Sequence, residues 1–157
     1  MGDIANLILP RLWLGNRESS MNPEFLRKNH ISVVFNCTKD LPFTTLPVKK
    51  YRVPVDDNLQ EQELRNMEKW GPEAVYKVLA EYHKGETILI HCFAGMQRSA
   101  AIMAMTLIVL ADKPSETVIA YIRSKRPIAF FPGENFGRSI RGFEQTWRSD
   151  RAKLQQM

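Results

Sequence analysis

The stretch 88–100 contains a cysteine, a glycine and an arginine at a spacing that could hold and attack a phosphate group. Cys92 follows a short apolar run, Gly95 lies in the turn after it, and Arg98 opens a helical pattern. A turn between a strand and a helix N-terminus directs backbone N–H groups toward an anion, and a guanidinium can bind two phosphate oxygens. Gly95 permits a backbone turn that a side chain would obstruct. The stretch therefore predicts an anion-binding loop.

Cys92 lies at the base of this predicted loop. A thiol near a helix N-terminus and a guanidinium has its pKa lowered well below the free value of about 8.5, so that it is a thiolate at neutral pH. Such a thiolate could attack a bound phosphorus in line and form a cysteinyl-phosphate. A buried structural cysteine is an equally good interpretation of Cys92 alone. The complete pattern at 91–99, with His, Cys, Gly, Arg and Ser in a strand–loop–helix context, favours the nucleophile.

The other residues of the loop receive predicted roles from their position. The backbone N–H groups of six residues are the expected phosphate ligands: Phe93, Ala94, Gly95, Met96, Gln97 and Arg98. Ser99 could donate its hydroxyl to the Cys92 sulfur and help the thiolate leave, or it could bond the backbone in the first helical turn. His91 is expected to orient the loop through hydrogen bonds rather than to transfer protons.

Cleavage of a phosphate ester by a thiolate also needs a proton donor for the departing oxygen. Asp56 and Asp57 are adjacent, after an alternating strand pattern and before a helical one. Neighbouring side chains on an extended segment point in opposite directions, so only one of the two should face the loop. From the residues alone either could be the acid, or both could be solvated turn residues.

These residues need strands and helices to bring them together. Strand patterns cover 7–9, 12–14, 31–37, 51–55 and 87–91. Helical patterns begin at Asn22-Pro23 and cover 61–84, with a break at Gly71-Pro72, and then 98–111, 115–126 and 135–151. Strands separated by helices indicate an α/β fold. We expect a central, mostly parallel sheet of about five strands flanked by helices, with the phosphate-binding loop between a central strand and a helix N-terminus.

Length and composition limit the remaining possibilities. The chain has 157 residues, 44% hydrophobic and 25% charged, which predicts one globular domain over 1–157 with a frayed polar tail at 148–157. The net charge of +5 favours an anionic substrate or partner. The longest apolar run, 100–111, is too short to cross a bilayer, so no membrane partner is expected. Two cysteines without a disulfide framework favour an intracellular location, in the cytoplasm, the nucleus or both.

No metal site or cofactor is predicted, since His30 and His83 have no cysteine or carboxylate partners at ligand spacing. Cys37 ends a predicted buried strand and is interpreted as a small core residue. A disulfide between Cys37 and Cys92 is the alternative, and it requires a Cα separation below about 7 Å. Four arginines at 138–151 could flank the site or form a solvated helix face.

The segment His91–Ser99, HCFAGMQRS, is similar to the signature loop of cysteine-dependent protein phosphatases, and its surroundings resemble the dual-specificity branch. The similar segments are 12–16, 31–37, 51–58, 132–136 and 143–144. The resemblance implies a compact catalytic core without a cofactor. It also implies phosphorylated proteins as substrates, both at phosphotyrosine and at phosphoserine or phosphothreonine, and a cysteinyl-phosphate intermediate.

The same resemblance assigns two further residues. It implies that Asp57 is the general acid, which then activates water as a base, with Asp56 as the competitor. Asn135 resembles the asparagine that braces the phosphate loop of the family. In this chain Gly133 and Glu134 interrupt the family's Ser-Pro-Asn pattern before Asn135.

Three other function classes stay open at this point. An RNA 5′-triphosphatase of the same superfamily would share the loop, but the basic and aromatic residues are not interleaved as base stacking requires. A phosphate-binding module without turnover would not need Cys92, Arg98 and an aspartate together. A thiol-redox or sulfur-transfer enzyme would not need Asp57. Uncharged loop side chains also disfavour a phosphoinositide phosphatase, whose loop resembles this one but contains lysines.

Overall fold

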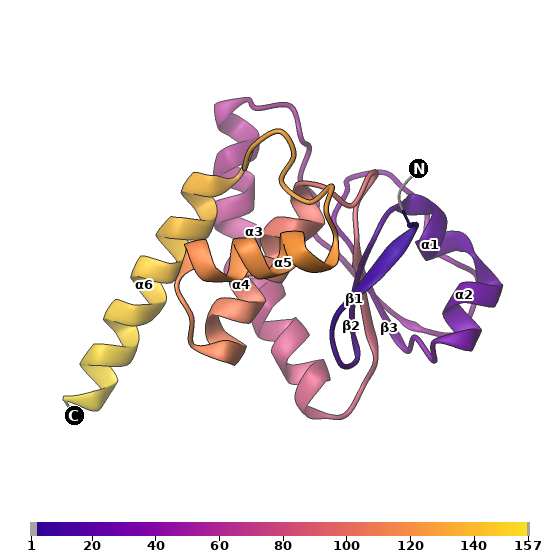
Figure 1. Ribbon diagram of the computed structural model, residues 1–157, viewed down its shortest axis with the longest axis horizontal. Helices are drawn as coiled ribbons and strands as arrows, with labels where there is room; N and C mark the ends of the chain where they lie inside the picture. The colour runs from indigo at the N-terminus through magenta and orange to yellow at the C-terminus, as the bar shows by residue number, and fades with distance from the viewer. Residues whose placement is uncertain (1–2, 157) are drawn as a thin grey trace.

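The computed structural model describes residues 3–156, which form a five-stranded sheet between two helical layers (Figure 1). The strands are β1 (Ala5–Leu9), β2 (Leu12–Gly15), β3 (Val33–Asn36), β4 (Lys49–Arg52) and β5 (Ile88–His91). Their order in the sheet is β1-β2-β5-β3-β4. Only β1 and β2 pair antiparallel, and the other neighbours are parallel. The expected α/β fold with a mostly parallel sheet is confirmed, and β5 is its central strand.

Helices cover both faces of this sheet (Figure 1). They are α1 (Arg17–Met21), α2 (Pro23–Lys28), α3 (Glu61–His83), α4 (Arg98–Ala111), α5 (Ser115–Lys125) and α6 (Gly137–Gln155). The short helices α1 and α2 lie on one side, and α3 to α6 lie on the other. Asn22 caps α2 as predicted, because its side-chain oxygen accepts a hydrogen bond from the N–H of Phe25 at 3.0 Å.

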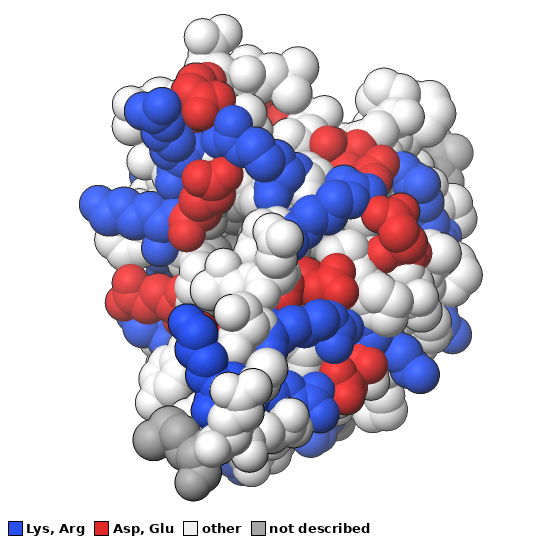
Figure 2. Space-filling view, turned by 90° about the vertical axis from the view of Figure 1, so that its left-hand side faces the viewer, with Lys and Arg blue, Asp and Glu red and all other residues white. Residues whose placement is uncertain are grey.

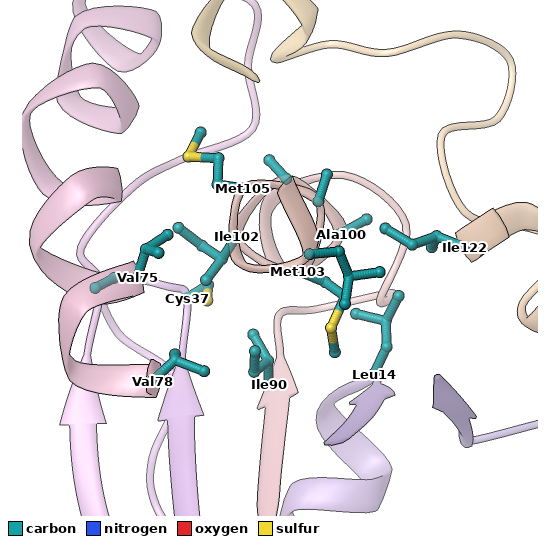
Figure 3. Packing of buried hydrophobic residues seen from close by; sticks show 14 of the residues in the cluster. Leu14, Cys37, Val75, Val78, Ile90, Ala100, Ile102, Met103, Met105 and Ile122 are labelled. Carbon is teal, nitrogen blue, oxygen red and sulfur yellow. The ribbon is translucent and has the colours of Figure 1, made fainter. Parts of the chain in front are cut away.

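The core fixes the position of α4 behind β5. Ile88 and Ile90 belong to the hydrophobic cluster under α3 to α6, whereas Leu89 belongs to the cluster under α1 and α2. This alternation is expected for a strand buried on both faces. Residues 99–108 of α4 are all buried, and Figure 3 shows α4 side chains packed toward Ile90 below and toward Val75 of α3. The loop between β5 and α4 is therefore held at both ends by rigid elements.

The predicted helix break at Gly71 and Pro72 is wrong, because α3 continues through both residues. A proline inside a helix loses one hydrogen bond and costs about 3 kcal/mol. The next turns compensate, since Ala74, Val75 and Val78 are buried in the larger cluster. Packing of the apolar face of α3 therefore outweighs the low helix preference of Gly71 and Pro72.

The tail at 148–157, predicted to fray, is helical up to Gln155, and its last residue lies outside the described part of the chain. Arg148 and Arg151 form ion pairs with Asp112 at 3.2 and 2.8 Å. Asp112 is the C-cap of α4. These contacts connect the tail to the end of the central helix.

Several other boundaries differ from the prediction. The strand expected at 51–55 occupies Lys49–Arg52 instead, because Pro54 has no N–H for a ladder. The last helix begins at Gly137 rather than Asn135. Helix α1 was not predicted, since its short polar sequence has no apolar periodicity. Over residues 3–156, no helix combines the length and apolarity needed to cross a membrane.

Candidate active site

The predicted anion-binding loop lies between the C-terminal end of β5 and the first turn of α4. Within the described chain, no backbone N–H group of residues 93–97 donates to a backbone carbonyl. The N–H of Gly95 is directed to the sulfur of Cys92, and the others are available to an anion. Gly95 has a φ of +69°, and a Cβ atom there would lie 2.5 Å from the carbonyl oxygen of Gly15. Only glycine fits this conformation and this close approach.

Cys92 lies at the base of the loop with 2% of its surface exposed. Its Sγ is 3.1 Å from the hydroxyl oxygen of Ser99, which is itself buried. Burial by itself would raise the pKa of Cys92, but hydrogen bonds from Ser99, the charge of Arg98 and a hydrogen bond from the Gly95 backbone outweigh it and lower the pKa. The site therefore favours the thiolate form.

Arg98 makes one hydrogen bond to the backbone and keeps a buried N–H without a partner among the described residues. Its Nη1 donates to the carbonyl oxygen of Val55 at 3.1 Å, which directs the guanidinium toward the segment that carries the two aspartates. Its Nε is buried and has no acceptor among residues 3–156. Because a buried donor without a partner costs about 1–3 kcal/mol, this N–H is suited to a bound oxyanion.

His91 is fully buried, and its Nδ1 lies 3.2 Å from the carbonyl oxygen of Cys92. Burial lowers its pKa to about 4, so the imidazole is neutral at pH 7. A neutral ring must donate from Nδ1 to this carbonyl oxygen, which agrees with an orienting role. Its Nε2 has no partner within the described residues.

A second guanidinium, that of Arg126, is buried and contacts the backbone of the loop. The sequence did not indicate this residue. It is 1% exposed, and it donates to the carbonyl oxygens of Gly95 at 2.9 Å and Ala94 at 3.1 Å. It also donates to the backbone of Asp3 and the side chain of Asn6. Its position in the sequence could have indicated burial. Arg126 follows Ile119 and Ile122 at helical spacing, in line with the apolar face of α5.

Asp56 and Asp57 point to different partners, as expected for neighbours on an extended segment. Asp56 pairs with Lys39 at 3.3 Å, and its backbone N–H donates to Glu63 at 2.8 Å. The Oδ1 of Asp57 accepts a hydrogen bond from the side chain of Asn135 at 2.8 Å. Asp56 is thus held by the start of α3, whereas Asp57 is held by the segment that precedes α6.

Asn135 makes its contacts through Gln97 and Asp57. Its backbone N–H donates to Oε1 of Gln97 at 3.0 Å, and its side chain donates to Asp57. Gln97 is 4% exposed, so its side chain is turned away from solvent. The amide of Asn135 therefore contacts the aspartate, while its backbone is the part that contacts the phosphate-loop residue.

Cys37 is fully buried in the larger core cluster, and both it and Cys92 are free thiols. The core interpretation of Cys37 agrees with this burial, and the alternative disulfide is not formed. Burial, followed by the charge of Cys92, raises the pKa of Cys37 well above its usual value. The pKa values of the two thiols are therefore shifted in opposite directions.

The four arginines of α6 are engaged in ion pairs rather than left free. Their carboxylate partners are Glu61 and Glu68 for Arg138, Glu116 and Glu134 for Arg141, Glu144 and Asp112 for Arg148, and Asp112 for Arg151. Figure 2 shows basic and acidic side chains interleaved over the side of the molecule that carries α6. This pattern favours the solvated helix face over a substrate-binding patch.

Over the described residues, no three histidine, cysteine or acidic side chains are grouped so that they could hold a metal ion. The side chains at the site are a thiol of lowered pKa, the guanidinium of Arg98, the hydroxyl of Ser99 and the carboxyl group of Asp57.

Comparisons with known proteins agree with this geometry. A model of the dual specificity phosphatase catalytic domain matches residues 12–146. The chain is 29% identical to human dual specificity protein phosphatase 16 over 148 residues, which are 90% of this chain and only 22% of that protein. It is 26% identical to human dual specificity protein phosphatase 22 over 145 residues, which are 92% of this chain and 76% of that protein.

A solved structure is similar over nearly the same range. The crystal structure of a mouse putative dual specificity phosphatase, complexed with zinc tungstate, superposes with a TM-score of 0.83 at 25% identity. The superposition covers 94% of this chain and 91% of the mouse chain.

Proposed function

Because the chain belongs to the dual specificity phosphatase family, as its signature loop predicted, we propose that it hydrolyses phosphate monoesters on proteins. The substrates are phosphotyrosine and phosphoserine or phosphothreonine side chains. The observation that carries this proposal is the thiol of Cys92, 3.1 Å from the hydroxyl of Ser99, at the base of a loop whose N–H groups at 93–97 donate to no backbone carbonyl of the described chain. A buried thiol with a lowered pKa in such a place is suited to nucleophilic attack.

In the proposed first step, the phosphoryl group lies in the loop and Arg98 binds two of its oxygens. The sulfur of Cys92 donates an electron pair to phosphorus, and the bond from phosphorus to the departing oxygen breaks. That oxygen takes the proton of Asp57 and leaves as an alcohol or phenol. The product is a cysteinyl-phosphate.

In the proposed second step, Asp57 acts as a carboxylate and takes a proton from water, whose oxygen attacks phosphorus. The sulfur–phosphorus bond breaks, and inorganic phosphate is released. The hydroxyl of Ser99, 3.1 Å from the sulfur, stabilises the departing thiolate with a hydrogen bond. Neither step needs a metal ion or an organic cofactor.

The proposal includes the substrate class and the location. The family resemblance suggests a shallow site that accepts both long and short phosphorylated side chains. Uncharged side chains at Phe93, Ala94 and Met96 favour phosphoproteins over multiply phosphorylated lipids. A cytoplasmic or nuclear location is part of the proposal, because the nucleophile must stay a free thiol.

The test is hydrolysis of a generic aryl phosphate with a chelator present. We expect turnover by the wild type and none by Cys92→Ser. Asp57→Ala should reduce the rate more than Asp56→Ala, and the reverse order would reassign the acid. A wild type without turnover that binds phosphopeptides tightly would show a binding module instead. A triphosphate-ended RNA that is hydrolysed in preference to phosphopeptides would overturn the proposed substrate class.

A further inference from the structure

We propose that Gln97, acting through Asn135, positions the carboxyl group of Asp57, so that a phosphate-loop side chain holds the proton donor in place. This inference rests on the proposed function for its kinetic consequences. Its structural core is a chain of hydrogen bonds from Gln97 to Asn135 and from Asn135 to Asp57.

Gln97 is buried, and all hydrogen bonds of its side-chain amide within the described chain are made with residues 131–135. Its Nε2 donates to the carbonyl oxygens of Phe131 at 3.1 Å and Gly133 at 2.8 Å. Its Oε1 accepts from the backbone N–H of Asn135 at 3.0 Å. Both hydrogens of the amide nitrogen are thus used, and the two carbonyls fix which end of the amide faces them. One side chain therefore sets the path of residues 131–135.

Asp57 depends on that segment for its own position. It is exposed, and it lies in a stretch between β4 and α3 that has no regular secondary structure. Among the described residues, its side chain has one hydrogen-bond partner, the amide of Asn135 at 2.8 Å. Its neighbour Asp56 is fixed independently, by Lys39 and Glu63. Asn135 is therefore the contact that distinguishes the position of Asp57 from that of a solvated turn residue.

The side chain of Gln97 is long enough to contact three backbone groups of residues 131–135. Gly133 and Glu134 separate Pro132 from Asn135. The amide of Gln97 reaches the carbonyls on both sides of Pro132 and still accepts from Asn135. A shorter side chain at position 97 could not hold all three groups. Gln97 and residues 131–135 are therefore connected by three hydrogen bonds.

The kinetic test uses aryl phosphates with leaving groups of decreasing acidity. A good leaving group departs without a proton, whereas a poor one needs the acid, whose contribution is about 10²–10⁴-fold. We expect Gln97→Ala to reduce kcat/KM about tenfold or more for the poorest leaving group and less than about twofold for the best. Asn135→Ala should reproduce this pattern, and it is the second variant if Gln97→Ala folds poorly. Gln145→Ala, an exposed glutamine of α6, is the matched control and should change nothing.

The double variant with Asp57→Ala tests whether Gln97 positions Asp57 or only stabilises the local structure. There, Gln97→Ala should cause no further loss for the poor leaving group, because the group it positions is gone. Competitive inhibition by inorganic phosphate should stay within about twofold of the wild type in every variant. An equal loss for all leaving groups, a weaker phosphate affinity, or a full additional loss in the Asp57→Ala background would overturn the inference.

Amide hydrogen exchange tests the contact without turnover. In Gln97→Ala, the backbone N–H of Asn135 loses its acceptor and should exchange at least tenfold faster, while protection in α4 stays unchanged. Unchanged exchange at Asn135 would contradict the inference even if the kinetics changed. If the wild type hydrolyses nothing, the proposed function fails, and the exchange result still decides whether Gln97 holds Asn135.

Discussion

The hydroxyl oxygen of Ser99 lies 3.1 Å from the sulfur of Cys92, and both side chains are buried. A hydroxyl in this place donates to a thiolate more strongly than to a thiol, because the thiolate is the better acceptor. The contact therefore lowers the pKa of Cys92 and opposes the effect of burial. It also connects the nucleophile to the first turn of α4, which the core holds rigidly.

Replacing Ser99 by alanine should raise the pKa of Cys92. At a fixed neutral pH the thiolate fraction then falls, so alkylation of Cys92 by iodoacetate should slow, and its pH profile should move to higher pH. The measurement is the alkylation rate between about pH 5 and pH 9, followed by peptide mass spectrometry. Cys37 serves as the internal control, because its burial and raised pKa should keep it unmodified. An unchanged profile in Ser99→Ala would show that this hydrogen bond does not control the thiol.

Arg98→Lys should weaken anion binding although it keeps the charge. Lysine has no counterpart of the buried Nε, and it cannot present two parallel N–H groups to one phosphate. We expect the inhibition constant of inorganic phosphate to rise about tenfold or more, which corresponds to roughly 1.5 kcal/mol. The control is Arg65→Lys, which changes an exposed arginine of α3. Equal phosphate affinity in Arg98→Lys and the wild type would exclude Arg98 as the phosphate ligand.

Arg126→Met should destabilise the protein through the phosphate loop. The substitution keeps most of the volume but leaves the carbonyl oxygens of Gly95 and Ala94 without their donor. We expect a loss of roughly 3 kcal/mol, which lowers Tm by about 10 °C for a domain of this size. Thermal unfolding measures it, with the exposed Arg27→Met as control. Burying the charge of Arg126 costs desolvation energy, which opposes the free energy gained from these hydrogen bonds. An Arg126→Met protein with wild-type Tm and an ordered loop would show that the hydrogen bonds contribute no net stability.

Much of the site could be predicted because it depends on one continuous stretch. The apolar run, the glycine and the arginine between Ile88 and Ser99 determine a strand, a turn and a helix start by local rules. Arg126 and Gln97 were different, since their roles depend on distant segments that local patterns do not reveal. Arg126 contacts Gly95 from 31 positions away, and Gln97 contacts Gly133 from 36 positions away. Such contacts follow from how α5 and the segment after it pack on the loop.

The same reasoning explains the difference in α3. The break expected at Pro72 follows from the low helix preference of proline and glycine, and the tertiary packing of α3 overrides that preference. The polar tail was expected to fray. In the structure it is helical up to Gln155, and Arg148 and Arg151 pair with Asp112 at the end of α4.

His91 should make the folded state sensitive to mild acid. Its pKa is about 4 in the folded protein and 6.5 in the unfolded chain, so the unfolded chain binds the proton more tightly. The free energy of unfolding is therefore unaffected by this titration above pH 6.5 and decreases as the pH falls from 6.5 toward 4. The decrease is about 3 kcal/mol at pH 4. Urea unfolding of the wild type and His91→Asn, which can still donate to the Cys92 carbonyl, gives the difference. Equal losses of stability in the two proteins between pH 7 and pH 4 would contradict this burial effect.

The transfer of a phosphoryl group to Cys92 can be observed directly by trapping the intermediate. Ser99→Ala should slow the departure of the thiolate in the second step and let the cysteinyl-phosphate accumulate. The measurement is rapid acid quenching during hydrolysis of an aryl phosphate, followed by peptide mass spectrometry. We predict one phosphoryl group on the peptide that contains Cys92, and none after the same treatment of Cys92→Ser. Turnover without a phosphoryl group on Cys92, or undiminished hydrolysis by Cys92→Ser, would contradict the nucleophilic role of this thiol.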